Sequence, residues 1–97
     1  MTSTDLRPTI AHAQRTITEF LLSDIETGLQ LLQHAVSTRE PQLAERDIAL
    51  ASEAYESVGQ KLRRTPLDPE QWNEVVEALE KLGAQLRAAG RDPESML

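Results

Sequence analysis

Cysteine is absent from this chain of 97 residues, and aromatic residues make up only 3% of it. Without thiols the chain can form no disulfide, no thiolate metal site and no cysteine nucleophile. With so few rings, its core must be built from Leu, Ile, Val and Ala. No apolar run comes near the roughly 20 residues that a membrane-spanning helix needs, so we expect no membrane span.

The beginning of the chain also lacks the basic and then apolar regions of a secretory signal, which predicts a cytoplasmic protein. Positive charge is scarce, because 10 Lys and Arg residues stand against 16 Asp and Glu, for a net charge of −6. Phosphate contacts need a basic stripe, and none runs along any segment. The sequence therefore predicts that nucleic acid is not a partner.

Nothing in the chain has the alternation of a half-buried strand or the turn residues of a tight hairpin. Apolar residues instead recur every three or four positions in three segments with short connections. This spacing predicts one all-α domain over residues 1–97, an antiparallel up-down-up three-helix bundle. The predicted helices span about 8–36, 39–64 and 69–89, with 1–7 and 91–97 as frayed tails.

Capping residues mark two of the predicted helix starts. Ser37 and Glu40 have capping-box spacing before the second helix, and Asp68 and Gln71 have it before the third. Gly90 is a typical residue just beyond a helix end. These signals predict that the second helix begins between Thr38 and Pro41, and that the third has Asp68 as its N-cap.

The first predicted helix has an apolar arc of about 200°, whereas an ordinary surface helix needs little more than about 100°. The surplus lies on two edges, one through Ala13, Phe20 and Leu31 and the other through Leu22, Leu29 and Val36. We expect one edge to remain uncovered as a strip that binds another protein. The candidate interface residues are Phe20, Leu22, Leu29, Leu31 and Val36.

Asp24 lies within the same apolar arc, where a carboxylate must find a partner or reach water. Counting helical rises places it near Tyr55 of the second helix, whose phenol could donate to it. Either this pair is a structural hydrogen bond, or Asp24 and Tyr55 line an interior polar pocket. The same counting predicts that the first and third helices approach closely at Gly28 and Gly83.

The sequence contains no arrangement typical of catalysis, so we predict no enzyme, no cofactor and no metal site. His12 and His34 lie about 33 Å apart on one helix and cannot share a metal, so both are expected to be solvated. No glycine-rich phosphate loop or serine nucleophile motif is present. The sequence favours a module that binds itself or another helical protein; a domain that binds a small ligand near Asp24 and Tyr55 is the alternative.

Overall fold

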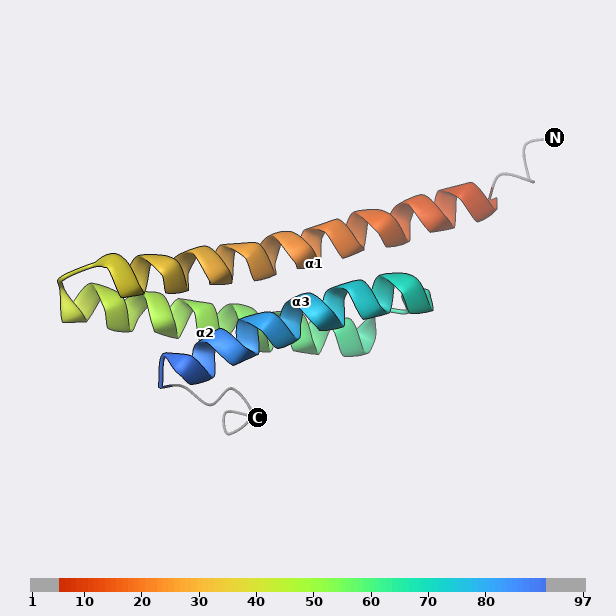
Figure 1. Cartoon of the computed structure of the whole chain (residues 1–97). Helices are drawn as coiled ribbons and strands as arrows, with labels where there is room; N and C mark the ends of the chain where they lie inside the picture. Colours follow the sequence, from red (N-terminus) through yellow and green to blue (C-terminus); the bar gives the residue numbers. More distant parts are fainter. Residues whose placement is uncertain (1–5, 91–97) are drawn as a thin grey trace.

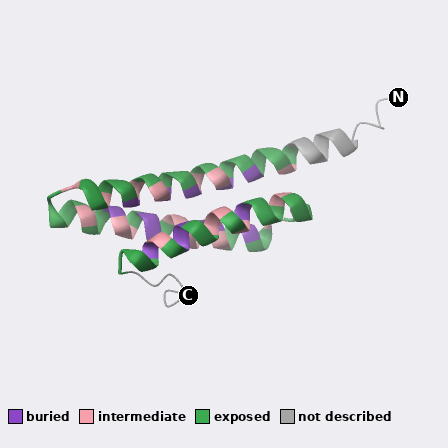
Figure 2. Ribbon diagram, viewed as in Figure 1, coloured by how far each residue is buried: buried purple, intermediate pink, exposed green. Residues whose placement is uncertain are grey.

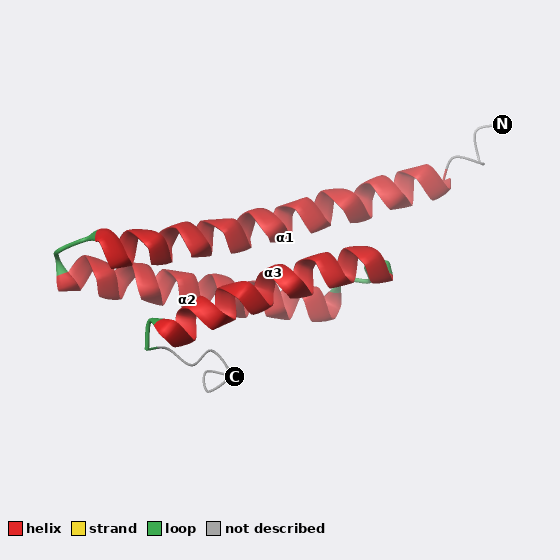
Figure 3. Cartoon of the chain, viewed as in Figure 1, coloured by secondary structure: helices red, strands yellow, loops and turns green. Residues whose placement is uncertain are grey.

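A computed structural model describes residues 6–90, with side chains from residue 13 onward. Three α-helices follow one another up, down and up: α1 is Leu6–Ser37, α2 is Pro41–Arg64 and α3 is Pro69–Ala88 (Figure 1). All three pack against one another, and no strand occurs within residues 6–90 (Figure 3). The prediction of an all-α three-helix bundle is confirmed. In the described part of the chain, no helix is long and apolar enough to cross a membrane.

The helix boundaries differ from the predicted ones by one or two residues. α1 begins at Leu6, before Pro8, because proline is tolerated anywhere in the first turn, where amide hydrogens have no helical partner. α2 begins at Pro41 instead of residue 39, and α3 ends at Ala88. Of the two predicted tails, residues 1–5 and 91–97 lie outside the described residues.

The two predicted capping boxes have different outcomes. Asp68 is the N-cap of α3, since its Oδ1 accepts from the backbone N–H of Gln71 at 2.8 Å. The side chain of Gln71 returns a bond of 2.9 Å to Asp68 Oδ2 rather than to its backbone. The predicted Ser37–Glu40 box is wrong: α1 continues through Ser37, whose hydroxyl donates to the carbonyl of Gln33, and Glu40 caps α2 without a side-chain bond.

The core lies along the line where the three helices meet, and it is aliphatic (Figure 2). Phe20 and Trp72 stay outside it, with 65% and 38% of their surfaces exposed. The apolar part of the interior is aliphatic because the sequence has few rings, and the hydroxyl side chains of Thr18 and Ser52 are buried beside it. The buried apolar residues are Leu21, Ile25, Leu32, Ala51, Val58, Leu62, Val75, Leu82 and Leu86.

The two glycines expected to face one another each accommodate a larger side chain instead. A Cβ atom at Gly28 would lie 3.1 Å from a methyl group of Leu82, so α1 does approach α3 closely here. A Cβ atom at Gly83 would lie 3.0 Å from the ring of Tyr55, so this glycine faces α2. Small residues on α1 and α3 therefore make room for Leu82 and Tyr55 at the middle of the bundle.

Candidate functional site

The two ends of the bundle are built differently, and we name them here. The closed end is the one where the connection 65–68 joins α2 to α3, beside the residues of α1 near Gln14. The open end is the opposite one, where the connection 38–40 joins α1 to α2 and where α3 ends at Ala88. The side chains at each end determine what it can bind.

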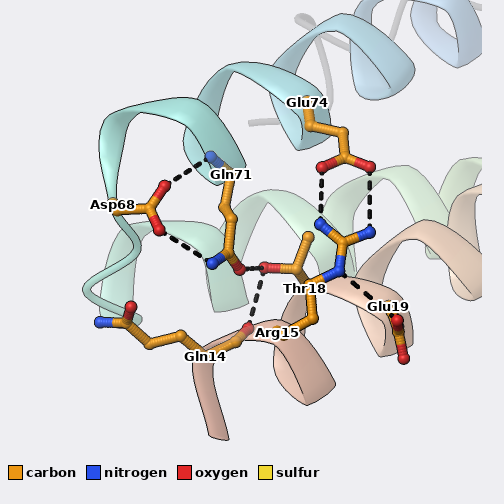
Figure 4. Close-up of polar contacts among 7 residues, drawn as sticks. All are labelled: Gln14, Arg15, Thr18, Glu19, Asp68, Gln71 and Glu74. Carbon is orange, nitrogen blue, oxygen red and sulfur yellow. Dashed lines mark hydrogen bonds and ion pairs between the residues drawn. The ribbon is translucent and has the colours of Figure 1, made fainter. Parts of the chain in front are cut away.

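Polar side chains of α1 fasten the closed end to the start of α3 (Figure 4). The amide of Gln14 donates to the carbonyl of Pro66 at 3.2 Å. Thr18 is fully buried, and its hydroxyl can donate to the carbonyl of Gln14, at 2.9 Å, or to Oε1 of Gln71. Because Gln71 is also bound to the N-cap Asp68, a continuous chain of hydrogen bonds runs from α1 to the first turn of α3.

An ion pair on the surface also connects α1 to α3, about one turn further along α3 than Gln71. The guanidinium of Arg15 makes two bonds to the carboxylate of Glu74, at 2.9 and 3.3 Å, and a longer one to Glu19 at 3.4 Å. The hydrogen bond from Arg15 lowers the pKa of the Glu74 carboxyl below its usual value, and Glu74 in turn raises the pKa of Arg15. Because the guanidinium of Arg15 is already paired with Glu74, it is not free to bind another molecule.

The closed end therefore has the chemistry of a structural joint. Its donors and acceptors are matched to one another, and no buried side-chain nitrogen or oxygen among the described residues lacks a partner. A ligand would have to displace bonds that are already made there.

The open end contains an apolar hollow of about 550 Å³ between the last turns of α1 and α3, with Ile48 of α2. Although charged residues are 27% of the sequence, none of the charged residues that the structure describes lines this hollow. Depletion of charge is characteristic of the centres of protein interfaces. The lining residues are Leu32, Gln33, Ala35, Val36, Ser37, Ile48, Gln85, Ala88 and Ala89.

The hollow exists because α3 stops before it covers the last turn of α1. Leu32 is 4% exposed and belongs to the core, whereas Val36, one turn later, is 85% exposed. α3 ends at Ala88 with Ala89 as its C-cap, and Gly90 follows with a φ of 87°, a left-handed conformation that does not continue the helix. Val36 is consequently left as an apolar projection at the edge of an apolar recess.

The interface candidates from the sequence do not form one uncovered strip. Leu22, Leu29 and Leu31 are half-buried and pack against the core, because α2 and α3 together cover most of the wide arc of α1. Phe20 and Val36 are the exposed ones. They lie about 24 Å apart along α1 and about 160° apart around it, so only Val36 belongs to the hollow.

The pocket candidates Asp24 and Tyr55 also lie in different surroundings. Asp24 is half-buried, and its Oδ2 lies 3.7 Å from the ammonium of Lys61 at the end of α2. Tyr55 packs on Gly83 and lines a smaller hollow of about 180 Å³ that Asp24 does not line. The structure therefore places a cation of α2, and not the phenol of Tyr55, beside this carboxylate.

Sequence reasoning missed one polar contact near the open end. His34 was expected to be solvated; its side chain is 60% exposed, but its Nδ1 pairs with Asp47 of α2, whose side chain is only 12% exposed. The signal was present, because Asp47 stands between Ala44 and Ala51 in the apolar stripe of its helix. Within the described residues, no three acidic or histidine side chains come together as metal ligands.

The fold and the site define a small three-helix bundle with one polar, fastened end and one open, apolar end. Among known protein families, curated proteins and solved structures, none matches this chain. The open end is therefore the part of the described structure whose chemistry indicates a function.

Proposed function

We propose that this protein is a protein-interaction module that binds its partner through the hollow at the open end. The observation that carries the proposal is an uncharged apolar recess of about 550 Å³ with Val36, 85% exposed, at its edge. Leaving this surface in water costs about 25 cal/mol for each Å² of apolar area, and a protein partner would remove it from water. Exposed apolar surface of this kind marks interaction sites on small proteins.

The shape of the hollow favours a protein over a small molecule. Small-ligand pockets bury about 70–90% of their ligand and place a few polar groups to orient it. Within residues 13–90 this hollow is open on one side, and the polar side chains of its lining are the uncharged ones of Gln33, Ser37 and Gln85. The smaller hollow beside Tyr55, of about 180 Å³, is below the usual range of about 300–1,000 Å³ for ligand pockets.

The proposal can be tested by site-specific photo-crosslinking with p-benzoylphenylalanine in cells that express the protein. The probe replaces Gln33, which lines the hollow, and the matched control replaces Gln30, an exposed glutamine of the same helix outside it. We expect a discrete adduct from position 33 and none from position 30. Adding Val36→Glu should remove the adduct, because a charge in an apolar contact is costly.

Unfolding of the protein does not explain such a loss, because Val36 is exposed in the single chain, and its substitution should leave the melting temperature at low protein concentration nearly unchanged. Circular dichroism of the Val36→Glu variant checks this directly. No adduct from position 33, equal adducts from both positions, or an adduct that survives Val36→Glu would overturn the proposal.

A further inference from the structure

We infer that the partner bound at the open end is a second copy of this chain. The two copies are related by a two-fold axis, and each binds the open-end hollow of the other. This inference rests on the proposed function and specifies its partner. Two features of the open end support it: a projection beside a recess, and a lining in which none of the described residues is charged.

Self-association about a two-fold axis requires a surface that is complementary to itself. Such a surface needs a projecting group and a recess side by side, so that each copy fills the other. Val36 projects from the last turn of α1, and the recess between Leu32, Ile48 and Ala88 lies directly beside it. A two-fold rotation brings Val36 of each copy to the recess of the other.

Electrostatics also favours a second copy at this position. Each chain carries a net charge of −6, so two copies repel one another across most of their surfaces. None of the described residues that line the hollow is Asp, Glu, Lys or Arg, so these residues add no repulsion when two copies meet there. A basic partner would gain little from such a surface, because its attraction is to carboxylates, which lie elsewhere.

A domain of this size also has a thin stability margin, to which burial of Val36 and its surroundings adds.

Sedimentation equilibrium over a wide range of concentrations tests the inference. We expect wild-type protein to approach twice the chain mass, and Val36→Glu to raise the dimer dissociation constant by at least about tenfold. Phe20→Glu, at an exposed apolar residue outside the hollow, should leave dimerisation unchanged. A wild-type monomer at all concentrations, or equal effects of the two substitutions, would overturn the inference.

The absence of native cysteine allows a second, geometric test. Ser37→Cys places a thiol at the edge of the hollow, and Ser23→Cys places one on an exposed part of α1 away from it. A short bis-maleimide should join two Ser37→Cys chains and leave Ser23→Cys chains single. Failure to join the Ser37→Cys chains contradicts a two-fold contact at the open end.

The two proposals can fail separately. If photo-crosslinking at position 33 yields an adduct with a different protein while the chain sediments as a monomer, the proposed function stands and the inference of a second copy is wrong. If position 33 yields no adduct and the chain remains a monomer, both are wrong.

Discussion

The closed end and the open end of this bundle use the same three helices in opposite ways. At the closed end, Thr18, Gln71 and Asp68 form a chain of hydrogen bonds in which each polar group has a partner from the chain itself. At the open end, α3 stops short and leaves Val36 and an uncharged recess in solvent. The difference separates the residues that hold the fold together from those available to a partner.

The comparison also shows why α1 has such a wide apolar arc. Near the middle of the bundle both flanks are used, since α2 and α3 cover Leu22, Leu29 and Leu31. Near the open end, the edge of α1 that contains Val36 extends about one turn beyond the part of α1 that α3 covers. The surplus apolar surface of α1 is therefore exposed at Val36 near the open end and separately at Ile17 and Phe20, and it does not form one strip along the helix.

The largest expected change in stability distinguishes a core residue from a surface residue near the open end. Leu86→Ala removes a side chain that is fully buried and should cost about 2–5 kcal/mol of stability. Val36→Ala, near the same end, should change stability by no more than about 0.5 kcal/mol in the monomer. Urea unfolding at low protein concentration measures both. Similar losses would mean that Val36 is packed in the core and that the hollow beside it is filled.

A smaller effect tests the hydrogen bonds of the closed end. Thr18→Val keeps the shape of the side chain but leaves Oε1 of Gln71 without its donor, which should cost about 1–3 kcal/mol. Thr27→Val is the control, because Thr27 is exposed and its hydroxyl bonds only within its own helix. Its effect should lie within about 0.5 kcal/mol of zero. Equal thermal stabilities of the two variants would contradict the role of Thr18.

The helix starts at the two ends should respond in opposite directions. Asp68→Ala removes the cap of α3 and should cost about 1 kcal/mol. Glu40 caps α2 at the open end without a side-chain bond, so Glu40→Asp should gain up to about 1 kcal/mol by supplying a shorter carboxylate. Thermal unfolding of both variants checks the signs. A loss of stability in Glu40→Asp would show that the start of α2 is already satisfied.

The smallest effect is the pH dependence of the surface ion pair at the closed end. Because Arg15 lowers the pKa of Glu74 in the folded protein, the pair stabilises fully above the usual carboxyl value of 4.5, and this stabilisation disappears as the pH falls through the lowered value. Glu74→Gln should therefore reduce stability near neutral pH and approach wild type in acid. Urea unfolding from about pH 6 to about pH 3 measures this difference.

Arg15→Gln provides an independent check on the same pair. It removes the hydrogen bond that shifts the pKa of Glu74, so its stability should also approach that of wild type in acid. A constant difference from wild type at every pH, in either variant, would assign the effect to packing instead of charge.

Much of the fold could be predicted because it is encoded locally. The stripe of each helix and the Asp68–Gln71 cap depend on residues three or four positions apart, which the sequence displays directly. The Ser37–Glu40 spacing is just as regular, yet no cap forms there. Whether such a pair caps a helix depends on where the preceding helix ends, and α1 continues through Ser37.

The candidate site could be predicted less well because it depends on the relative positions of helices. The width of the arc on α1 indicated surplus apolar surface, but the position at which α3 stops selects Val36 and leaves Leu22 and Leu29 covered. Asp24 was expected to pair with Tyr55 because counting helical rises places the two residues at the same height along the bundle. The side chain of Lys61 is long enough to reach the same carboxylate from a position almost two turns beyond Tyr55 on α2.

Trp72, the only tryptophan, has a spectroscopic consequence. Its indole lies on α3 near the closed end, and it lines the smaller hollow together with Tyr55 and Leu62 of α2. With 38% of its surface exposed, its fluorescence responds to whether the first half of α3 is seated on α2. If α3 detaches while α1 and α2 stay helical, the emission will shift to the red before the helical circular dichroism signal is lost.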